Sequence, residues 1–595
     1  MSTVITHPAA DVVVLGEGVM GGEISVKLAL AGLKVVGIEK GPYWNYLIDF
    51  ATTKYDEWGI QIMRKNDHPL PLSTVTLRNN SNQFALPVRR NTTGQGTSSG
   101  HGVGGACQHY GAYFGRYSPW TYAIRSNTIS RYGQAYLDAA APNGDITDFP
   151  FTYNDALPYY KDFEAGWGVS GTNQEPSCPD STYPLPPHPQ TPVAAVFQSA
   201  AESLGINNWP SPSAIASQPF VNQYGVQVNA CVYDGWCSCT SYPCETGAKA
   251  NSAVRTVPAA IKTGNLDLRT NAYAYRLDID PNTALATQVR YYDAMGNVHI
   301  QPAKAFANTM WGFLMFRMFA LSGVGQQYNS TTVTGSLGRG PHDPTGAPTR
   351  TASGTINIGQ NNYTAGNGHG GGWSTYDFAD DFFDHTNVPV PYIGGTRNYY
   401  GLYPSSPGLV ALGANGSAAN IGSAYKASAV KRTQVTKQTI AASAAGMNVP
   451  MTTHYFDLDP HYNDVYGDPL ARYTVDHSPN AANASNDSPR LYTPVVQKMG
   501  VTVTTGPAVV VGSTNYNSWG IHIRGGVRIG TDPKLSALNR WQQIWSGATN
   551  CFASAEATQP NGSSVQVGGT HPAAVTAHIA ADGIQKYLQS PGPLV

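Results

Sequence analysis

Two histidines near the carboxyl end have the chemistry needed to oxidise an alcohol. His522 lies in the segment Trp519-Gly-Ile-His-Ile-Arg-Gly-Gly, and His571 follows 49 residues later in Gly568-Gly-Thr-His-Pro. Removing a hydride from an alcohol carbon requires a base for the hydroxyl proton, and imidazole titrates in the working range. A second imidazole can hydrogen-bond to the developing alkoxide and keep the C–H bond aimed at the acceptor. Either histidine alone is more often a structural residue, as we expect of His578 in the helical run that follows.

Four of the seven cysteines fall within fourteen residues, at Cys231, Cys237, Cys239 and Cys244. Such a cluster is compatible with an iron–sulfur cluster, a structural zinc ion, or disulfides in an exported protein. The spacing lacks the paired Cys-x-x-Cys knuckles usual for zinc. A three-iron cluster needs only three thiolates and tolerates another ligand at its fourth corner, where Asp234 could lie. The residues alone favour a cluster over disulfides only slightly. The other three cysteines lack a nearby partner in the sequence and are expected to be small, largely buried residues: Cys107, Cys178 and Cys551.

The element that would position a cofactor near these groups lies at the amino end. An apolar strand from Asp11 leads into Gly-x-Gly-x-x-Gly at Gly16, Gly18 and Gly21, a helical stretch follows, and a second apolar strand ends at Glu39. The first glycine allows a tight turn, the second lets a pyrophosphate approach the backbone, and the third lets helix and strand pack closely. The helix N-terminus offers N–H groups to the phosphates, and Glu39 lies where a carboxylate binds ribose hydroxyls. The segment therefore predicts a βαβ dinucleotide-binding unit.

A second glycine-rich loop, beginning at Gly100, contains Gly104 and Gly105 and closes at His109. Tight glycines would let the backbone approach a planar ring system. His109 could face that ring or bond to it covalently, and the simpler interpretation is a hydrogen-bonded histidine beside the cofactor.

The whole chain sets limits on these interpretations. A chain of 595 residues predicts two or three domains, and a net charge of −1 makes a nucleic-acid partner unexpected.

The longest apolar candidate, 310–321, is too short to span a bilayer and contains Arg317, so we expect a buried helix. The ten residues before Asp11 show no signal peptide. Apolar strands and a final helix return after Gly500, which favours a nucleotide domain assembled from distant segments with the middle of the chain inserted.

Taken together, these motifs resemble those of glucose-methanol-choline (GMC) oxidoreductases, and within that family the flavoproteins of bacterial membrane-bound gluconate 2-dehydrogenases. The resemblance covers nearly the whole chain. It rests on the two glycine motifs, the cysteine loop, and segments that begin at Gly247, Phe319, Phe383 and Gly525.

The resemblance implies an α/β fold with two kinds of domain. A Rossmann-like FAD-binding domain of GMC type is formed by the discontinuous segments 1–335 and 501–595, with the cysteine loop near 225–250. An α+β substrate-binding domain with an antiparallel sheet occupies 336–500. FAD is expected to be held non-covalently or through a bond to a histidine. The residues expected to bind it are Gly16, Gly18, Gly21, Glu39, Gly104, Gly105, His109, Glu556 and Pro572.

The same resemblance implies His522 as the base that faces the flavin and His571 as its partner. The gluconate dehydrogenase branch usually has Asn before this proline, whereas His571-Pro572 resembles the His/His pair of other GMC enzymes. Relatives with this cysteine loop carry a 3Fe-4S cluster on three thiolates, matched here by Cys231, Cys237 and Cys244 if two residues are inserted before Cys244. Cys239 then falls inside the insertion, and its role is uncertain.

The expected reaction is oxidation of a secondary alcohol of a sugar acid, first D-gluconate to 2-keto-D-gluconate, by hydride transfer to FAD. Electrons then pass through the iron–sulfur cluster to a membrane cytochrome c subunit. A small signal-bearing subunit would export the chain to the periplasmic face of the inner membrane, so membrane association is indirect; without a partner the chain would stay cytoplasmic. Arg524 and Arg528 are candidates to bind a substrate carboxylate.

Other functions stay open at this point. The substrate could be another sugar or polyol, such as glucose, fructose, sorbitol or 2-ketogluconate. The protein could instead be a sugar oxidase that uses oxygen, with disulfides in place of the cluster. A flavoprotein without catalysis, serving electron transfer or assembly, is the remaining alternative.

Overall fold

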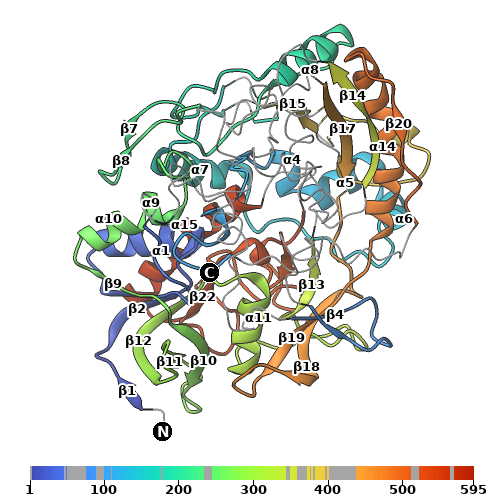
Figure 1. The fold of residues 1–595 in the computed structure, drawn as a ribbon. Helices are drawn as coiled ribbons and strands as arrows, with labels where there is room; N and C mark the ends of the chain where they lie inside the picture. The colour runs from blue at the N-terminus through green and yellow to red at the C-terminus, as the bar shows by residue number, and fades with distance from the viewer. Residues whose placement is uncertain are drawn as a thin grey trace, which may run out of the picture.

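The structure is a computed structural model whose two largest sheets lie in the lower half of the view in Figure 1, with most of the helices above them. It describes residues 3–45, 49, 75–88, 100–108, 110–173, 175, 177–178, 180–233, 244–343, 349–357, 372–375, 377–379, 382–395, 398–400, 437–445, 447–510, 522–562 and 569–594.

The predicted βαβ unit is present and opens the larger sheet. Strand β2 (Ala10–Leu15) leads into helix α1 (Val19–Leu30), and strand β3 (Val35–Ile38) returns parallel to β2. The apolar residues of β2 are buried on both of its faces, as expected of a strand inside a parallel sheet. The prediction of an α/β fold is therefore confirmed.

The larger sheet has eight strands drawn from distant parts of the chain, in the order β10-β11-β12-β2-β3-β9, with β1 and β22 also paired to β12. Strands β2, β3, β9, β12 and β22 run parallel, and β10, β11 and β12 pair antiparallel. The remaining strands of this sheet are β1 (Val4–Thr6), β9 (Leu266–Arg269), β10 (Tyr273–Ile279), β11 (Ala286–Tyr292), β12 (Val298–Asn308) and β22 (Cys551–Ala553).

The two faces of β2 belong to two different parts of the core, because successive side chains of a strand point to opposite faces. Val12 and Val14 pack with the buried side chains of α1, α10 (Val257–Lys262) and α15 (Thr570–Gln589). Val13 and Leu15 pack instead with helix α11 and the second sheet. The sheet is thus covered on one side by helices, seen around α1 and α15 in Figure 1.

The second sheet has six strands, in the order β21-β13-β18-β19-β4-β5. All neighbouring pairs are antiparallel except β19 and β4, which are parallel. Its strands are β4 (Val75–Arg78), β5 (Leu86–Val88), β13 (Arg339–His342), β18 (Tyr455–Asn463), β19 (Pro469–Thr474) and β21 (Arg524–Gly526). Segments 75–88 and 524–526 therefore share this sheet with strands of segment 339–474. The domain boundaries at 335 and 500 stay a prediction.

Helix α11 (Gly312–Leu321) confirms the buried helix expected around residues 310–321. Its one charged residue, Arg317, is 5% exposed and lies 2.7 Å from the Asp464 carboxylate. Within the described ranges, no helix has both the length and the apolar character needed to cross a membrane.

Smaller elements complete the described parts. The strands are β6 (Trp209–Pro210), β7 (Phe220–Val221), β8 (Gln227–Val228), β14 (Thr349–Asn357), β15 (Trp373–Thr375), β16 (Asn398–Tyr400), β17 (Lys437–Ala445) and β20 (Thr504–Thr505). The helices are α4 (Pro119–Tyr122), α5 (Ile124–Tyr132), α6 (Gln134–Ala140), α7 (Tyr153–Trp167), α8 (Pro192–Ser203), α9 (Ser252–Arg255) and α14 (Pro479–Lys498).

The third glycine of the fingerprint is required by packing. A Cβ atom at Gly21 would lie 1.8 Å from the carbonyl oxygen of Gly16, so helix α1 could not stay against the turn that follows β2. A Cβ at Gly18 would meet only the Gly105 Cα, at 3.9 Å.

Gly21→Ala is therefore expected to lower the free energy of unfolding by about 3 kcal/mol, because a rigid backbone must move to admit the methyl group. Urea unfolding followed by circular dichroism measures the change. Gly18→Ala is the matched control and should change stability much less. Equal stability of the two variants would contradict the packing role assigned to Gly21.

Candidate functional site

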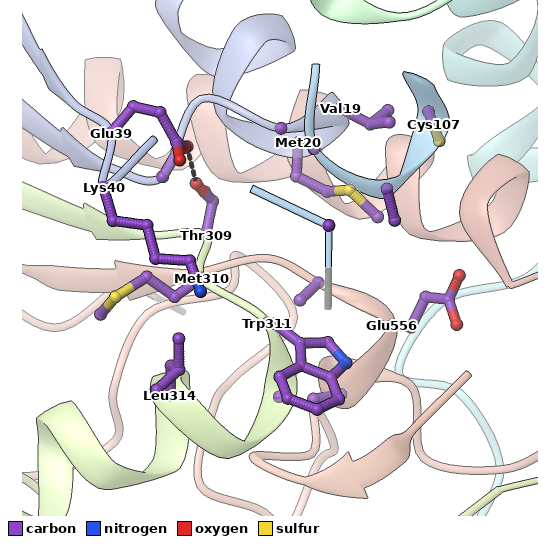
Figure 2. Close-up of a pocket in the computed structure, with 18 of the residues that line it drawn as sticks. Val19, Met20, Glu39, Lys40, Cys107, Thr309, Met310, Trp311, Leu314 and Glu556 are labelled. Carbon is purple, nitrogen blue, oxygen red and sulfur yellow. Dashed lines mark hydrogen bonds between the residues drawn. The ribbon is translucent and has the colours of Figure 1, made fainter. Parts of the chain in front are cut away.

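A cavity of about 180 Å³ lies where the amino-terminal βαβ unit meets the carboxyl-terminal segment. Figure 2 shows Glu39, Lys40 and Met310 on one side of it and Glu556 on the opposite side, with Trp311 between them. Six of the residues predicted to bind the cofactor line this cavity: Gly16, Gly18, Glu39, Gly104, Gly105 and Glu556.

The Glu39 carboxylate is fixed by backbone donors from three segments. The N–H groups of Gly41 and Gly102 donate to Oε1 at 2.9 and 3.0 Å, and the N–H of Glu17 donates to Oε2 at 3.0 Å. An ionised carboxylate offers about four acceptor positions, so about one is left for a ligand hydroxyl. This geometry fits the predicted contact between Glu39 and a ribose.

The two glycine loops touch each other beside the start of helix α1. The N–H of Gly104 donates to the Glu17 carbonyl at 2.9 Å, and a Cβ at Gly105 would lie 3.2 Å from the Gly18 Cα. Gly18 caps the helix without a side-chain hydrogen bond, so the N–H groups of the first turn are open to an anion. These residues fit the pyrophosphate of a dinucleotide. Gly21 does not line the cavity and acts through packing.

His522 is paired with a carboxylate that the sequence had suggested only as a cofactor contact. Its Nδ1 lies 2.9 Å from Oε2 and 3.1 Å from Oε1 of Glu556, and 27% of the His522 side chain is exposed. Burial alone would lower the pKa of His522, but the Glu556 carboxylate, helped by Asp343, outweighs it, and the pKa is raised. Because Nδ1–H donates to Glu556, the lone pair of the neutral ring is on Nε2, where a base needs it.

Glu556 is itself held in place from two directions. The Thr570 hydroxyl, at the start of α15, donates to Oε1 at 3.2 Å. A Cβ at Gly569 would lie 2.5 Å from the Glu556 Cδ, so only glycine leaves room for this carboxyl group. Burial raises the pKa of Glu556, but His522 and Arg524 outweigh it, so the group is an anion in the functional range.

His571 occupies a different environment from the one predicted for it. Its ring is fully buried, packs 4.8 Å from the Tyr160 ring and 5.0 Å from the Phe114 ring, and places Nε2 3.1 Å from the Glu164 carboxylate. Glu164 also binds Arg116 at 2.6 Å. Burial lowers the pKa of His571, and Arg116 adds to this effect, which leaves a neutral ring.

Among the described residues, no contact joins the two predicted catalytic histidines, His522 and His571. Glu556 is the partner of His522 instead, and the role of His571 stays a prediction. The neighbouring Pro572 is buried in the first turn of α15, and Thr570 is the residue of this turn that lines the cavity.

Sequence reasoning missed Glu164 and Arg116, which belong to no motif. One signal could have found Glu164. It lies on the buried face of helix α7, and a buried carboxylate needs a positively charged or hydrogen-bonding partner. His578 is buried and lies 2.8 Å from Glu23 and 3.1 Å from Asp162, which fits the structural role expected of it.

The cysteine loop is described only at its two ends. Cys231 and Cys244 are half-buried and pack against the same hydrophobic cluster as Cys107 and Val19, two residues that line the cavity. Cys237 and Cys239, and also His109, lie outside the described residues. Among the residues that are described, no disulfide joins two cysteines, and no group of three or more His, Cys, Asp or Glu side chains is arranged to hold a metal.

The two arginines near His522 differ in their surroundings. Arg528 is buried and binds the Asp145 carboxylate at 2.6 Å. Arg524 is buried over the Tyr117 ring, at 5.5 Å from its centroid, and contributes to the electrostatics of His522 and Glu556.

The chain is similar to known oxidoreductases over nearly its whole length. No family model matches the chain. It is 33% identical to the gluconate 2-dehydrogenase flavoprotein of Pantoea cypripedii, with 98% of this chain and 95% of that protein covered. It is 24% identical to the fructose dehydrogenase large subunit of Gluconobacter japonicus, with 98% of each chain covered. The fold is similar to that of formate oxidase, with a TM-score of 0.59, 11% identity, and 98% and 99% of the two chains covered.

The chain belongs to the glucose-methanol-choline (GMC) oxidoreductase family, as its sequence resemblance had indicated. It is an FAD-dependent enzyme that acts on alcohol groups, and the cavity between Glu39 and Glu556 is the place where its residues fit FAD.

The pairing of His522 with Glu556 predicts the pH dependence of activity. A base works only when neutral, so kcat/KM should rise with pH through the His522 pKa. Because Glu556 raises this pKa, the rise should occur above the ordinary histidine value of about 6.5. Glu556→Gln removes the negative charge, so the rise should move to lower pH.

A pH profile of kcat/KM with a fixed alcohol substrate measures this shift. Glu202→Gln, at an exposed glutamate in α8, is the matched control and should leave the profile unchanged. A profile that Glu556→Gln does not move would contradict the assignment of His522 as the titrating base.

Proposed function

We propose that the protein is an FAD-dependent dehydrogenase that oxidises a secondary alcohol of a sugar acid, first D-gluconate to 2-keto-D-gluconate. The observation that carries this proposal is the His522–Glu556 pair at the edge of the dinucleotide cavity, in a chain that matches a gluconate 2-dehydrogenase flavoprotein over nearly its full length.

Bound FAD supplies the two-electron acceptor for the substrate hydride. His522 Nε2 takes the proton from the substrate hydroxyl as the C–H bond breaks. The resulting imidazolium is stabilised by the Glu556 carboxylate, which also fixes the ring orientation through Nδ1. Thr570 and Gly569 keep that carboxylate in position, so the base is preorganised before the substrate binds.

The choice of a sugar acid rests on the relative's name and on the two arginines near His522. Arg528 shares the Asp145 carboxylate with Arg339, and both Arg524 and Arg528 stay candidates to bind a substrate carboxylate. The similarity to a fructose dehydrogenase large subunit favours a neutral sugar or polyol as the alternative substrate.

We propose that electrons leave FAD through a 3Fe-4S cluster held by Cys231, Cys237 and Cys244, with Cys239 as the uncertain thiol. Thiolates are the usual ligands of such clusters. Cys231 and Cys244 pack against a hydrophobic cluster that reaches the cavity wall at Cys107, and this contact supports a short path from the cofactor. A sugar oxidase with disulfides at these cysteines is the alternative.

The proposal includes partner subunits. The two relatives are named as a flavoprotein and as a large subunit, which supports assembly with other chains. We propose a cytochrome c subunit as the electron acceptor and a small signal-bearing subunit that carries the protein to the periplasmic face of the inner membrane.

Anaerobic mixing with D-gluconate should bleach the flavin absorbance of the purified holoenzyme. His522→Asn should slow this bleaching by about 10²- to 10⁴-fold, because the proton acceptor is lost. His461→Asn, at an exposed histidine whose ring lies tilted 5.4 Å from the Phe84 ring, is the matched control. Absence of bleaching with gluconate, fructose, sorbitol and glucose would overturn the proposed function.

Anaerobically purified protein should contain about three iron atoms per chain. Cys231→Ser and Cys244→Ser should each lower the iron content and slow electron transfer to an artificial acceptor, while bleaching by substrate persists. Cys551→Ser, in buried strand β22, is the matched control and should retain iron. Iron-free protein that reacts with oxygen would favour the oxidase instead.

A further inference from the structure

Glu17, the residue between Gly16 and Gly18 of the fingerprint, is a buried acid beside the cofactor loops. Its side chain is 0% exposed. A Cβ at Gly37 in β3 would lie 2.2 Å from Oε1 of Glu17, so the carboxyl group lies directly against the backbone of the larger sheet. An acid at this point of the turn is unexpected, because the turn faces a pyrophosphate that is itself negatively charged.

The backbone of Glu17 joins the segments that fit the cofactor. Its N–H donates to Oε2 of Glu39 at 3.0 Å, as described above. Its carbonyl oxygen accepts from the N–H of Gly104 at 2.9 Å and from the hydroxyl of Ser252, the first residue of α9, at 2.8 Å. A movement of Glu17 would therefore displace Glu39 and the second glycine loop together.

The carboxyl groups of Glu39 and Glu17 have different hydrogen-bond environments. Glu39 accepts from three backbone N–H groups, an arrangement that stabilises a carboxylate anion. Glu17 accepts from one side chain, the Ser25 hydroxyl, at 2.8 Å from Oε1. Its Oε2 is buried and has no hydrogen-bond partner among the described residues. A buried anion with one donor is poorly stabilised, so the Glu17 site suits a protonated acid.

Within the described ranges, no cation is paired with Glu17. The charged side chains of α1 and α9 have partners elsewhere: Lys27 with Asp162, Glu23 with His578, and Arg255 with the Trp167 carbonyl. The second glycine loop adds the titratable His101 and Cys107, but among the described residues only the charge of Glu39 acts on Glu17. Burial, together with this charge of the same sign, raises the pKa of Glu17 to about 8, against the Ser25 hydrogen bond.

Ionisation of Glu17 would place a second negative charge beside Glu39 and the expected position of the pyrophosphate. A buried charge without a cation is relieved only when water reaches it, and here the fingerprint turn would have to move away from β3. That movement would carry Glu39 and Gly104 with it. Cofactor binding and the ionisation of Glu17 therefore oppose each other.

We propose that Glu17 is a positioning residue for FAD that has to be a neutral acid: its protonated carboxyl group keeps the fingerprint turn against Gly37 and Ser25, and loss of the proton weakens FAD binding. Glu17 acts through Glu39 and the two glycine loops, not through contact with the cofactor. The role is independent of the substrate and of the cysteine loop, and it is separate from the proton transfer to His522.

Dilution of the holoenzyme, followed by the fluorescence of free flavin, measures the Kd of FAD as a function of pH. Because FAD binds the protonated form, Kd of the wild type should be about tenfold higher at about pH 9 than at about pH 7. Glu17→Gln has nearly the same shape and no charge, so its Kd should stay nearly constant over this range. Glu202→Gln is the matched control and should follow the wild type. The same pH dependence in the wild type and in Glu17→Gln would overturn the proposal.

Urea unfolding provides a second measurement that does not depend on how FAD is attached. The unfolded chain ionises Glu17 at the ordinary glutamate pKa of about 4.3, whereas the folded protein retains the proton up to about pH 8. The folded state therefore loses stability as the pH rises between these values, and Glu17→Gln lacks this loss. The urea midpoint of Glu17→Gln should rise relative to that of the wild type from about pH 5 to about pH 8. A constant difference would show that the buried group is not a neutral acid. Neither measurement involves turnover, so both outcomes are independent of the reaction proposed above.

Discussion

The close contact between helix α1 and the turn after strand β2 is the constraint on which the rest of the site depends. Gly21 makes it possible, because any side chain there would collide with the Gly16 carbonyl. The contact directs the first turn of α1 into the cavity and lets the second glycine loop approach at Gly104 and Gly105. Helix α15 packs on α1 in turn, and its first turn supplies Thr570 to Glu556. The geometry of the proposed base is therefore linked to a glycine at the other end of the chain.

The two histidines of the family motif have carboxylate neighbours and opposite pKa shifts. His522 is partly exposed and its carboxylate partner Glu556 outweighs the cost of burial, so its pKa is raised. His571 is fully buried and shares Glu164 with Arg116, and burial together with the Arg116 charge outweighs the carboxylate, so its pKa is lowered. A carboxylate neighbour thus does not determine the charge of a histidine by itself; burial and the nearest cation decide it. Of the two histidines, His522 is the one with a partly exposed side chain and with a carboxylate partner, Glu556, that lines the cavity.

Local patterns predicted the elements whose signal lies within one stretch of chain. The βαβ unit, the buried helix α11 and the final helix α15 follow from apolar periodicity and glycine spacing, and all three were confirmed. Contacts between distant segments could not be predicted in this way. The pairing of β4 with β19, of β22 with β12, and of Glu556 with His522 depends on how separate segments pack, and no periodic pattern encodes it.

Strand β22 has a consequence for the way the protein is made. Residues Cys551–Ala553 pair with β12 beside β2, and helix α15 covers the same sheet, so the last part of the chain completes a core begun by the first. Contacts of such long sequence separation are slow to form, and domains otherwise tend to fold as the chain emerges from the ribosome. The larger sheet of this protein therefore closes only after strand β22 has been synthesised. Glu556 and Thr570, which line the cavity, follow β22 in the chain, so the wall of the cavity is complete only after these residues have been synthesised.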